Sequence, residues 1–393
     1  MISAMLKNTM KTLLPIFVLG LLYALPASAQ EKQEPYLSIK LEIVRAIERG
    51  NAYLQSKQHT EGFWGESKYP AYTALALTAA MRSPSYDEAD YINNGYAWLS
   101  KQQKDDGGIY GKGLGTYNTA TSIVALVSAG DTSYHPAILK ARRFLINQQT
   151  DWDTKGEADN KYDGGIGYGG SYQHSDLSNT YLSIEALKLS RHIAQDDASG
   201  KQPELNWEAA IQFISRTQNL KETNELPETG DDGSFNYFPG NSKAGHHTKP
   251  DGSKVLRGYG SMSYAALLSM IYAELDENDV RITAVKNWLS ENFTVKENPG
   301  LATEDDPSLG QQGLFYYYHT MAKGLAAANI DALRTKDGKQ IDWRNELSNA
   351  ILSTQAPDGS WVNKNSRWWE SDPVLVTAYA VLTLEQIYHS IPE

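Results

Sequence analysis

A six-fold internal repeat constrains the fold of this 393-residue chain more than any other feature. In five segments an aromatic or apolar residue is followed five positions later by Gln: AYLQSKQ, AWLSKQQ, RFLINQQ, QFISRTQ and AILSTQ. A sixth segment, NWLSENF, has Phe293 in the place of the Gln. Successive units lie 45, 46, 69, 75 and 62 residues apart, and such self-similarity is typical of repeat architectures.

Each unit reads as a helix, a glycine-containing loop and a second helix. The first helix has amphipathic spacing and ends near the Gln, and the loop follows with sequences such as EGFWG, DDGGIYG and DGSW. The second helix, for example AYTALALTAA or GSMSYAALLSMIYA, is apolar on nearly all sides and should be buried. Its Ala, Ser and Thr residues allow neighbouring helices to approach closely.

Twelve helices that alternate between half-exposed and buried predict an outer and an inner ring. We therefore expect an all-α fold, an (α/α)6 toroid of six helical hairpins formed by residues 30–393. An open α-solenoid is the alternative, but its end repeats are usually atypical caps. Here the first and sixth units carry the most complete form of the motif, which favours closure.

The segment RGNAYLQSKQHTEGFW, residues 49–64, resembles the QW repeat of squalene and oxidosqualene cyclases. Gln58 and Trp64 occupy the positions of its Gln and Trp, and Gln355 and Trp361 repeat its second half. The resemblance implies a toroid of the terpenoid cyclase and protein prenyltransferase superfamily. It also implies that these four residues are structural and tie the end of one helix to the start of the next. A Gln can satisfy backbone groups at a helix end while an indole stacks on its amide.

The reaction of that superfamily is less evident. The resemblance implies an Asp-x-Asp-Asp cluster that protonates an alkene or epoxide, and the sequence contains none. The nearest pieces lie in loops, where Asp serves turns and helix caps: Asp151 with Asp153, Asp231 with Asp232, and Asp305 with Asp306. The chain has no Cys, so the Asp/Cys/His zinc site of the prenyltransferases is not expected. We expect neither a metal nor another cofactor.

The first residues read as an export signal. Lys7 and Lys11 precede an apolar run over 13–25, and small residues at 27–29 offer a cleavage site. Cleavage after Ala29 would leave 393 − 29 = 364 residues, with no integral membrane segment expected in them. The protein would then be periplasmic or secreted; an uncleaved membrane anchor is the alternative. Without Cys there is no lipidated-Cys anchor and no disulfide.

Charge and aromatic content bound the partners. The formal charge is −11, and removal of the two signal-peptide lysines makes it −13, which argues against nucleic acid or an anionic membrane surface. With 24 Tyr and 9 Trp against 8 Phe, most aromatic rings carry a polar group and suit half-wet clefts. We expect a small-molecule or glycan ligand in a central pocket, and the oligomeric state stays open.

Candidate site residues lie where inner helices should begin, because those ends frame the pocket mouth of a toroid. In YQHSDLSNTY, His174 could act as a base oriented by Asp176, with Asn179 one turn along the same face contacting substrate. The alternative makes Asp176 or Ser178 a helix cap and leaves His174 on a wet loop.

Two further segments supply candidates. In GLFYYYHTMAKGL, Tyr316 and Tyr317 could line the pocket, while His319 and Lys323 share a helix face suited to an anion or a proton transfer. In SRWWESDPVL, Trp368 and Trp369 form a stacking platform or a wedge between helices, and Asp372 is a catalytic candidate or the N-cap before Pro373. His174, Asp176, His319 and Asp372 are thus the catalytic candidates, and convergence of these groups with Tyr317 is expected. His246 and His247 lie in a long polar insertion that reads as a mobile loop or lid.

Three functions are compatible with these features. The first is an exported relative of the terpenoid cyclases that binds or transforms an isoprenoid-like molecule. The second is a polysaccharide-active toroid, either a lyase or a hydrolase, which is an analogy at the level of the fold. The third is a non-catalytic binding or scaffold protein.

Overall fold

The computed structural model describes residues 36–169, 174–198, 200–335 and 337–392. The proposed signal segment, residues 1–29, lies outside the described residues. Outer helices are α1 (Leu37–Ser56), α3 (Asp90–Ser100), α5 (His135–Ile146), α8 (Trp207–Arg216), α10 (Val280–Glu291) and α12 (Trp343–Leu352). Inner helices are α2 (Pro70–Arg82), α4 (Gly115–Ser128), α6 (Leu177–Leu189), α9 (Gly260–Tyr272), α11 (Leu314–Ala327) and α13 (Pro373–Ser390).

Minor elements complete the described fold. They are the short helix α7 (Arg191–Gln195), the 3-10 turns η1 (Thr132–Tyr134), η2 (Pro307–Gln311) and η3 (Arg367–Trp369), and the strands β1 (His246–Thr248), β2 (Lys254–Leu256), β3 (Leu333–Arg334) and β4 (Gln340–Ile341). The strands form two small antiparallel pairs, β1 with β2 and β3 with β4. The insertion that carries His246 and His247 is therefore in part a β-hairpin, and its strand β1 is exposed.

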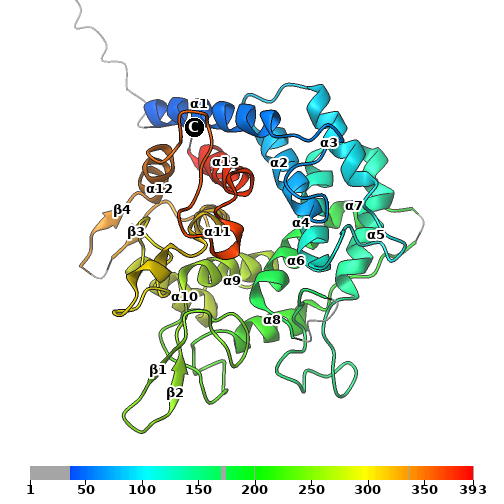
Figure 1. Cartoon of the computed structure of the whole chain (residues 1–393). Helices are drawn as coiled ribbons and strands as arrows, with labels where there is room; N and C mark the ends of the chain where they lie inside the picture. Colours follow the sequence, from blue (N-terminus) through cyan, green and yellow to red (C-terminus); the bar gives the residue numbers. More distant parts are fainter. Residues whose placement is uncertain (1–35, 170–173, 199, 336, 393) are drawn as a thin grey trace, which may run out of the picture.

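The inner helices form a closed ring (Figure 1). Each packs against the next in the order α2, α4, α6, α9, α11 and α13, and α13 packs against α2. On the outside, α1 contacts both α12 and α13. The toroid predicted from the repeat is confirmed, and the open solenoid is wrong.

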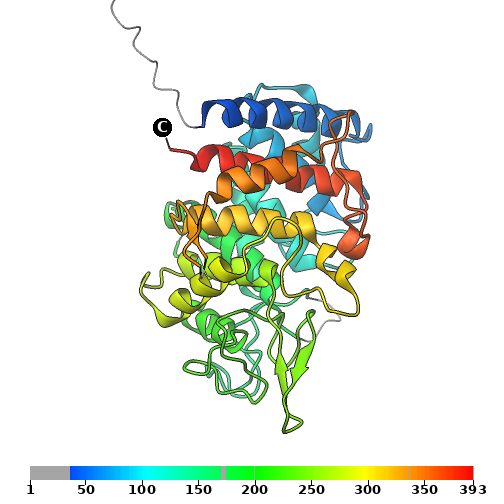
Figure 2. The ribbon, with the colours of Figure 1, turned by 90° about the vertical axis from the view of Figure 1, so that its left-hand side faces the viewer.

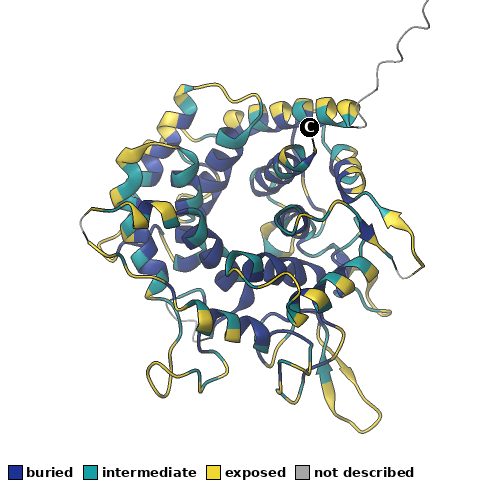
Figure 3. Cartoon of the chain, turned by 180° about the vertical axis from the view of Figure 1, so that it is seen from behind, coloured by how far each residue is buried: buried dark blue, intermediate teal, exposed yellow. Residues whose placement is uncertain are grey.

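Burial follows the predicted division into two rings. From behind, the inner ring is mostly buried while the outer helices and loops expose one side (Figure 3). The side view shows helices of the ring lying side by side and roughly parallel to one another (Figure 2). In α2 every residue from Pro70 to Ala80 is buried, whereas α1 buries only one stripe that includes Ile43, Ile47 and Leu54. A helix that is apolar on all sides lies inside, and an amphipathic one covers it.

The repeated Gln joins neighbouring units. The Nε2 of Gln58 donates to the carbonyl of Gly62 in its own loop (3.0 Å) and to that of Tyr91 in α3 (2.7 Å). Gln103, Gln149 and Gln218 make the same pair of bonds to their own loop and to the next outer helix or the residue that caps it. Gln355 reaches the carbonyl of Ala46 in α1 at 3.0 Å, so the sixth unit is bonded to the first by the same kind of bond that joins each of the first four units to the next. The fifth unit has Phe293 in the place of the Gln and cannot make this bond.

The indoles satisfy the helix ends. The Nε1 of Trp64 donates to the carbonyl of Leu54 near the end of α1 (2.6 Å), and that of Trp361 donates to Ile351 near the end of α12 (2.8 Å). The Gln was expected to satisfy the helix end, but the Trp does so instead. The Gln bonds its own loop and the next unit. Gly359, at φ +91°, is needed here because a Cβ would lie 2.4 Å from the carbonyl oxygen of Arg49.

Candidate functional site

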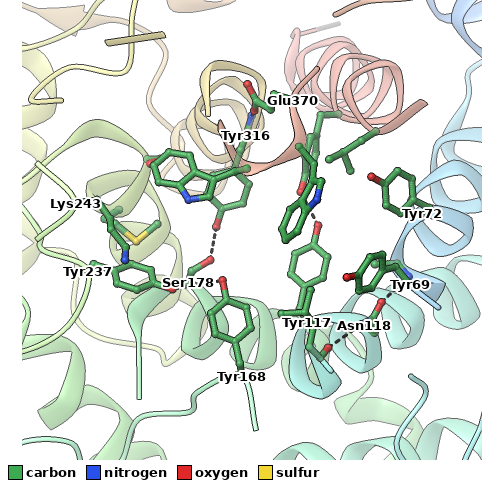
Figure 4. Close-up of a pocket in the computed structure, with 18 of the residues that line it drawn as sticks. Tyr69, Tyr72, Tyr117, Asn118, Tyr168, Ser178, Tyr237, Lys243, Tyr316 and Glu370 are labelled. Atoms are coloured by element: carbon green, nitrogen blue, oxygen red, sulfur yellow. Dashed lines mark hydrogen bonds between the residues drawn. The ribbon is translucent and has the colours of Figure 1, made fainter. Parts of the chain in front are cut away.

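A central pocket opens where the inner helices begin, as expected for a toroid. Its volume is about 990 Å³, counting the part that is open to solvent. The first turns of α2, α4, α6, α9, α11 and α13 and the loops before them supply its wall (Figure 4). Eight tyrosines line it: Tyr69, Tyr72, Tyr117, Tyr168, Tyr237, Tyr259, Tyr316 and Tyr379.

Several phenol groups in the pocket are bonded to one another or to a neighbouring hydroxyl. The hydroxyls of Tyr117 and Tyr379 are 2.6 Å apart, and the Tyr316 hydroxyl lies 3.1 Å from that of Ser178. Burial raises the pKa of Tyr117 to about 12, so this phenol is neutral at ordinary pH. The wall therefore presents ring faces whose polar groups are partly satisfied by neighbouring side chains.

Asp176 lies behind this wall at the start of α6. One carboxylate oxygen accepts from the backbone N–H of Asn179 (2.9 Å) and the other from its side-chain Nδ2 (2.8 Å). Burial raises the pKa of Asp176 to about 6, although the bonds from Asn179 and Tyr237 oppose that rise. Asp176 is thus the N-cap of α6, the alternative considered for it.

Glu370 and Asp372 cap two other inner helices. Glu370 borders the pocket and accepts from the backbone N–H of Tyr316 (2.8 Å) and from Nδ2 of Asn363 (2.7 Å). Burial raises the pKa of the Glu370 carboxyl. Asp372 accepts from the backbone N–H of Val374 (2.8 Å) at the start of α13. All three carboxyl groups direct oxygens at helix N-termini, where backbone N–H groups lack partners within the helix.

The tandem tryptophans lie at the pocket mouth. Trp368 and Trp369 both have left-handed backbone conformations, with φ of 57° and 62°. Such angles are strained for a large side chain and persist only where packing compensates. The Trp368 ring packs closely on Gly313, the residue before α11, while 55% of Trp369 is exposed. The strained turn holds both indoles at the opening of the pocket.

The predicted site residues do not meet in one place. Tyr316, Trp368 and Trp369 line the pocket, and Asp176, Asn179 and Asp372 lie at helix starts beside it. His174 instead stacks on Phe238, with ring centroids 4.3 Å apart. Tyr317 points away from the axis and donates to the carbonyl of Thr294 (2.8 Å).

His319 and Lys323 lie deeper in the ring, in a second cavity. The helix carries them one and two turns past Tyr316, along the axis and away from the mouth. The expected convergence of His174, Asp176, Tyr317, His319 and Asp372 is therefore not found.

Most of the pocket wall was missed from the sequence. Tyr69, Tyr72, Tyr117 and Tyr259 stand just before or in the first turn of three inner helices. A tyrosine at that position of successive repeats is the pattern that could have revealed them. Lys243 could not be found in this way, because the long insertion brings its amine over the Tyr237 ring, 4.5 Å from the centroid.

The described residues contain no group of three or more His, Cys, Asp or Glu side chains that could hold a metal ion. Within the same ranges, no helix combines the length and the hydrophobicity needed to cross a bilayer.

The fold and the pocket define a helical toroid with an aromatic central cavity. No model of a known protein family matches the sequence. A probable squalene–hopene cyclase from Sinorhizobium fredii is 29% identical over 131 residues, a match that covers 28% of this chain and only 20% of that protein.

Solved structures resemble the chain over nearly its whole length. A single-substitution variant of the type II terpene cyclase MstE from Scytonema, in complex with geranylgeranyl dihydroxybenzoate, superposes with a TM-score of 0.54 at 11% identity, and the match covers 90% of this chain and 99% of that one. A polysaccharide lyase has a TM-score of 0.52 at 14% identity, covering 89% and 98%. The chain therefore has the helical-toroid fold that the resemblance to the terpenoid cyclase and protein prenyltransferase superfamily implies.

Proposed function

We propose that the central pocket binds a terpenoid-like molecule, a branched polyprenyl chain or a fused-ring product of one. The observation that carries this proposal is the pocket wall of eight tyrosines and two tryptophans. Several of the tyrosine hydroxyls are bonded to neighbouring side chains. Ring faces of this kind offer a hydrocarbon extensive apolar contact, and the few polar groups at the rim orient a polar end. MstE, which shares the fold, holds a geranylgeranyl compound.

We further propose that this protein does not begin its chemistry as squalene-type cyclases do. Protonation of an alkene needs a carboxyl that is neutral, strongly acidic and aimed at the substrate. Asp176, Glu370 and Asp372 instead accept hydrogen bonds at the starts of inner helices. The pocket then serves binding, or a reaction that requires no carboxylic acid.

The test is a binding measurement on the purified mature chain. Geranylgeraniol and squalene should quench tryptophan fluorescence saturably, whereas hexadecanol, which lacks the branches, should bind about tenfold more weakly. Trp369→Ala should weaken binding, because an aromatic contact contributes about 1 kcal/mol, or roughly fivefold. The matched control is Trp152→Ala, since Trp152 is also exposed but lies outside the pocket lining. No saturable binding of any isoprenoid would overturn the proposal, and cyclised squalene in the extract would overturn its second part.

A polysaccharide-active enzyme is the second candidate. It is favoured by the exposed Trp369 at the mouth and by Lys243, a cation on the pocket wall that suits a uronate carboxylate. A lyase would create an unsaturated bond that absorbs in the ultraviolet, and a hydrolase would create reducing ends. Product from a uronate-containing glycan, together with no isoprenoid binding, would establish this candidate in place of the first.

Export is also proposed, from the charged and apolar pattern of residues 1–29. The full chain expressed in a Gram-negative host should be found in the periplasm or medium, shortened at its N-terminus. A chain that lacks residues 1–29 should stay in the cytoplasm. Retention of the full-length chain in the membrane fraction would instead support the uncleaved anchor.

A further inference from the structure

A layer of tyrosines separates the central pocket from a second cavity. Tyr117, Tyr316 and Tyr379 line both spaces, and the first and third of them are joined by the 2.6 Å hydrogen bond between their hydroxyls. We call these three residues the tyrosine partition and the space beyond them the inner chamber. The inner chamber has a volume of about 490 Å³, counting the part that is open to solvent, which is half that of the outer pocket counted in the same way.

The inner chamber lies further along the inner helices, toward their C-terminal ends. On α11 the order from the partition inward is Tyr316, His319 and Lys323. Arg82, which also lines the chamber, is the last residue of α2. The chamber lies away from the helix N-termini, so free backbone N–H groups cannot satisfy the polar side chains that line it.

Lys323 and Glu185 form an ion pair inside the chamber. Their exposed fractions are only 7% and 2%, and the Lys323 amine also donates to the Tyr181 hydroxyl at 2.9 Å. The two charges therefore cancel. A lysine ammonium has three N–H donors, and these two contacts use two of them.

Two further groups facing the chamber are uncommitted. The Nδ1 of His319 is buried and has no hydrogen-bond partner among the described residues. Burial lowers the pKa of His319 well below its ordinary value, so the ring is neutral and its Nδ1 can carry a proton to donate. The side chain of Arg82 has no ion pair in the described chain, and arginine is always charged.

The acids near Arg82 do not neutralise it. Glu185 forms its ion pair with Lys323. Glu385, on α13, is fully buried with no partner for either oxygen among the described residues, and burial raises its pKa well above the ordinary value, which favours the neutral form although the charge of Arg82 opposes the rise. The tyrosines around the chamber, Tyr181 and Tyr272 among them, are neutral phenols whose pKa burial raises, and a ring nitrogen of His389 lies 3.3 Å from the Arg82 carbonyl oxygen. Arg82, whose side chain is half-buried, thus brings to the chamber a positive charge that no carboxylate of the described chain pairs with, and His319 adds a donor without a partner there.

We propose that the inner chamber is a binding site for a small monocarboxylate anion, held by the Arg82 guanidinium, the third N–H of Lys323 and the Nδ1 of His319. One negative charge balances Arg82, and two carboxylate oxygens accept from the three donors. Acetate and propionate are simple anions of this class and serve as the probes. This site is separate from the outer pocket and does not depend on the function proposed for it.

The experiment compares acetate with acetamide, which has nearly the same shape but no charge. Titration calorimetry of the mature protein in a constant total of chloride should show saturable binding of acetate. Acetamide should bind at least tenfold more weakly. No acetate binding up to tens of millimolar, equal affinity for acetamide, or competition by chloride as effective as that by propionate would each overturn the proposal.

Variants locate the site. Arg82→Gln should weaken acetate binding about tenfold or more, as expected for loss of a charge-assisted hydrogen bond. The matched control, Arg191→Gln, removes an arginine that pairs with Glu274 outside the chamber and should leave the affinity unchanged. His319→Leu replaces the imidazole with an apolar side chain of similar size and should weaken acetate binding severalfold. This second variant keeps the test valid if the Arg82 variant folds poorly. Unchanged acetate affinity in a folded Arg82 or His319 variant would place the anion elsewhere.

Discussion

The inner chamber is lined by five of the six inner helices that frame the outer pocket, all but α9, yet the two spaces treat buried charge in opposite ways. At the mouth, Asp176, Glu370 and Asp372 are satisfied by backbone N–H groups at helix starts. In the chamber, mid-helix Glu185 has no such donors and is paired with Lys323. The difference shows that position along the helix decides whether a carboxylate needs a cation: the first turn provides donors and the later turns do not.

The largest expected effect breaks the pairing in the chamber. Lys323→Met leaves the Glu185 carboxylate buried without its cation and should lower the free energy of unfolding by about 3–5 kcal/mol. Urea denaturation followed by circular dichroism measures this loss. The double variant Lys323→Met with Glu185→Leu removes both charges and should recover most of the lost stability. A double variant as unstable as the single one would show that packing, and not charge, dominates at this position.

The second prediction concerns the capped carboxyl at the mouth. Because the pKa of Asp176 is raised to about 6 in the folded chain, the native state holds this proton more tightly than the unfolded state does. Below the unfolded pKa of about 3.9 the group is protonated in both states and contributes nothing. As the pH rises toward 6 the unfolded state releases its proton first, so the stability falls by up to about 3 kcal/mol.

Asp176→Asn should remove that loss. An Asn side chain keeps the acceptor for the N–H of Asn179, and the Asn179 amide can turn its unpartnered Oδ1 toward the new donor. Urea unfolding at several pH values should therefore show the variant gaining on the wild type between pH 4 and 6. Other carboxyl groups titrate in both proteins, so the difference between the two curves is the informative quantity. Parallel curves would mean that Asp176 does not titrate in this window.

The sequence revealed the ring more readily than the pocket. Gln58 and Gln355 recur at a fixed distance from a glycine, because each bonds the carbonyl of that glycine and the neighbouring unit. Such a contact leaves a regular trace along the chain. The spacing therefore predicted both the number of hairpins and their closure.

The pocket could not be predicted in the same way. Tyr316 and Tyr317 are adjacent in sequence, yet one faces the pocket and the other bonds Thr294 outside it. About 100° of helical rotation separates them, and the phase of an entirely buried helix is not evident from its composition. Glu370 was missed because it caps α11 from 54 residues further along the chain, a distance that only the folded ring closes.

The smallest expected effect lies at the partition between the two regions. Tyr117→Phe removes one hydroxyl of the pair and leaves the buried Tyr379 hydroxyl without that partner, so stability should fall by about 1–2 kcal/mol. Removing both hydroxyls, in Tyr117→Phe with Tyr379→Phe, should be nearly neutral, because neither polar group is then left unsatisfied. The double-mutant cycle, measured by urea unfolding, gives the coupling of the two phenols. Simple additivity of the two single changes would show that the hydroxyls do not interact, and the partition would then be a steric boundary between hydrocarbon and charge rather than a hydrogen-bonded one.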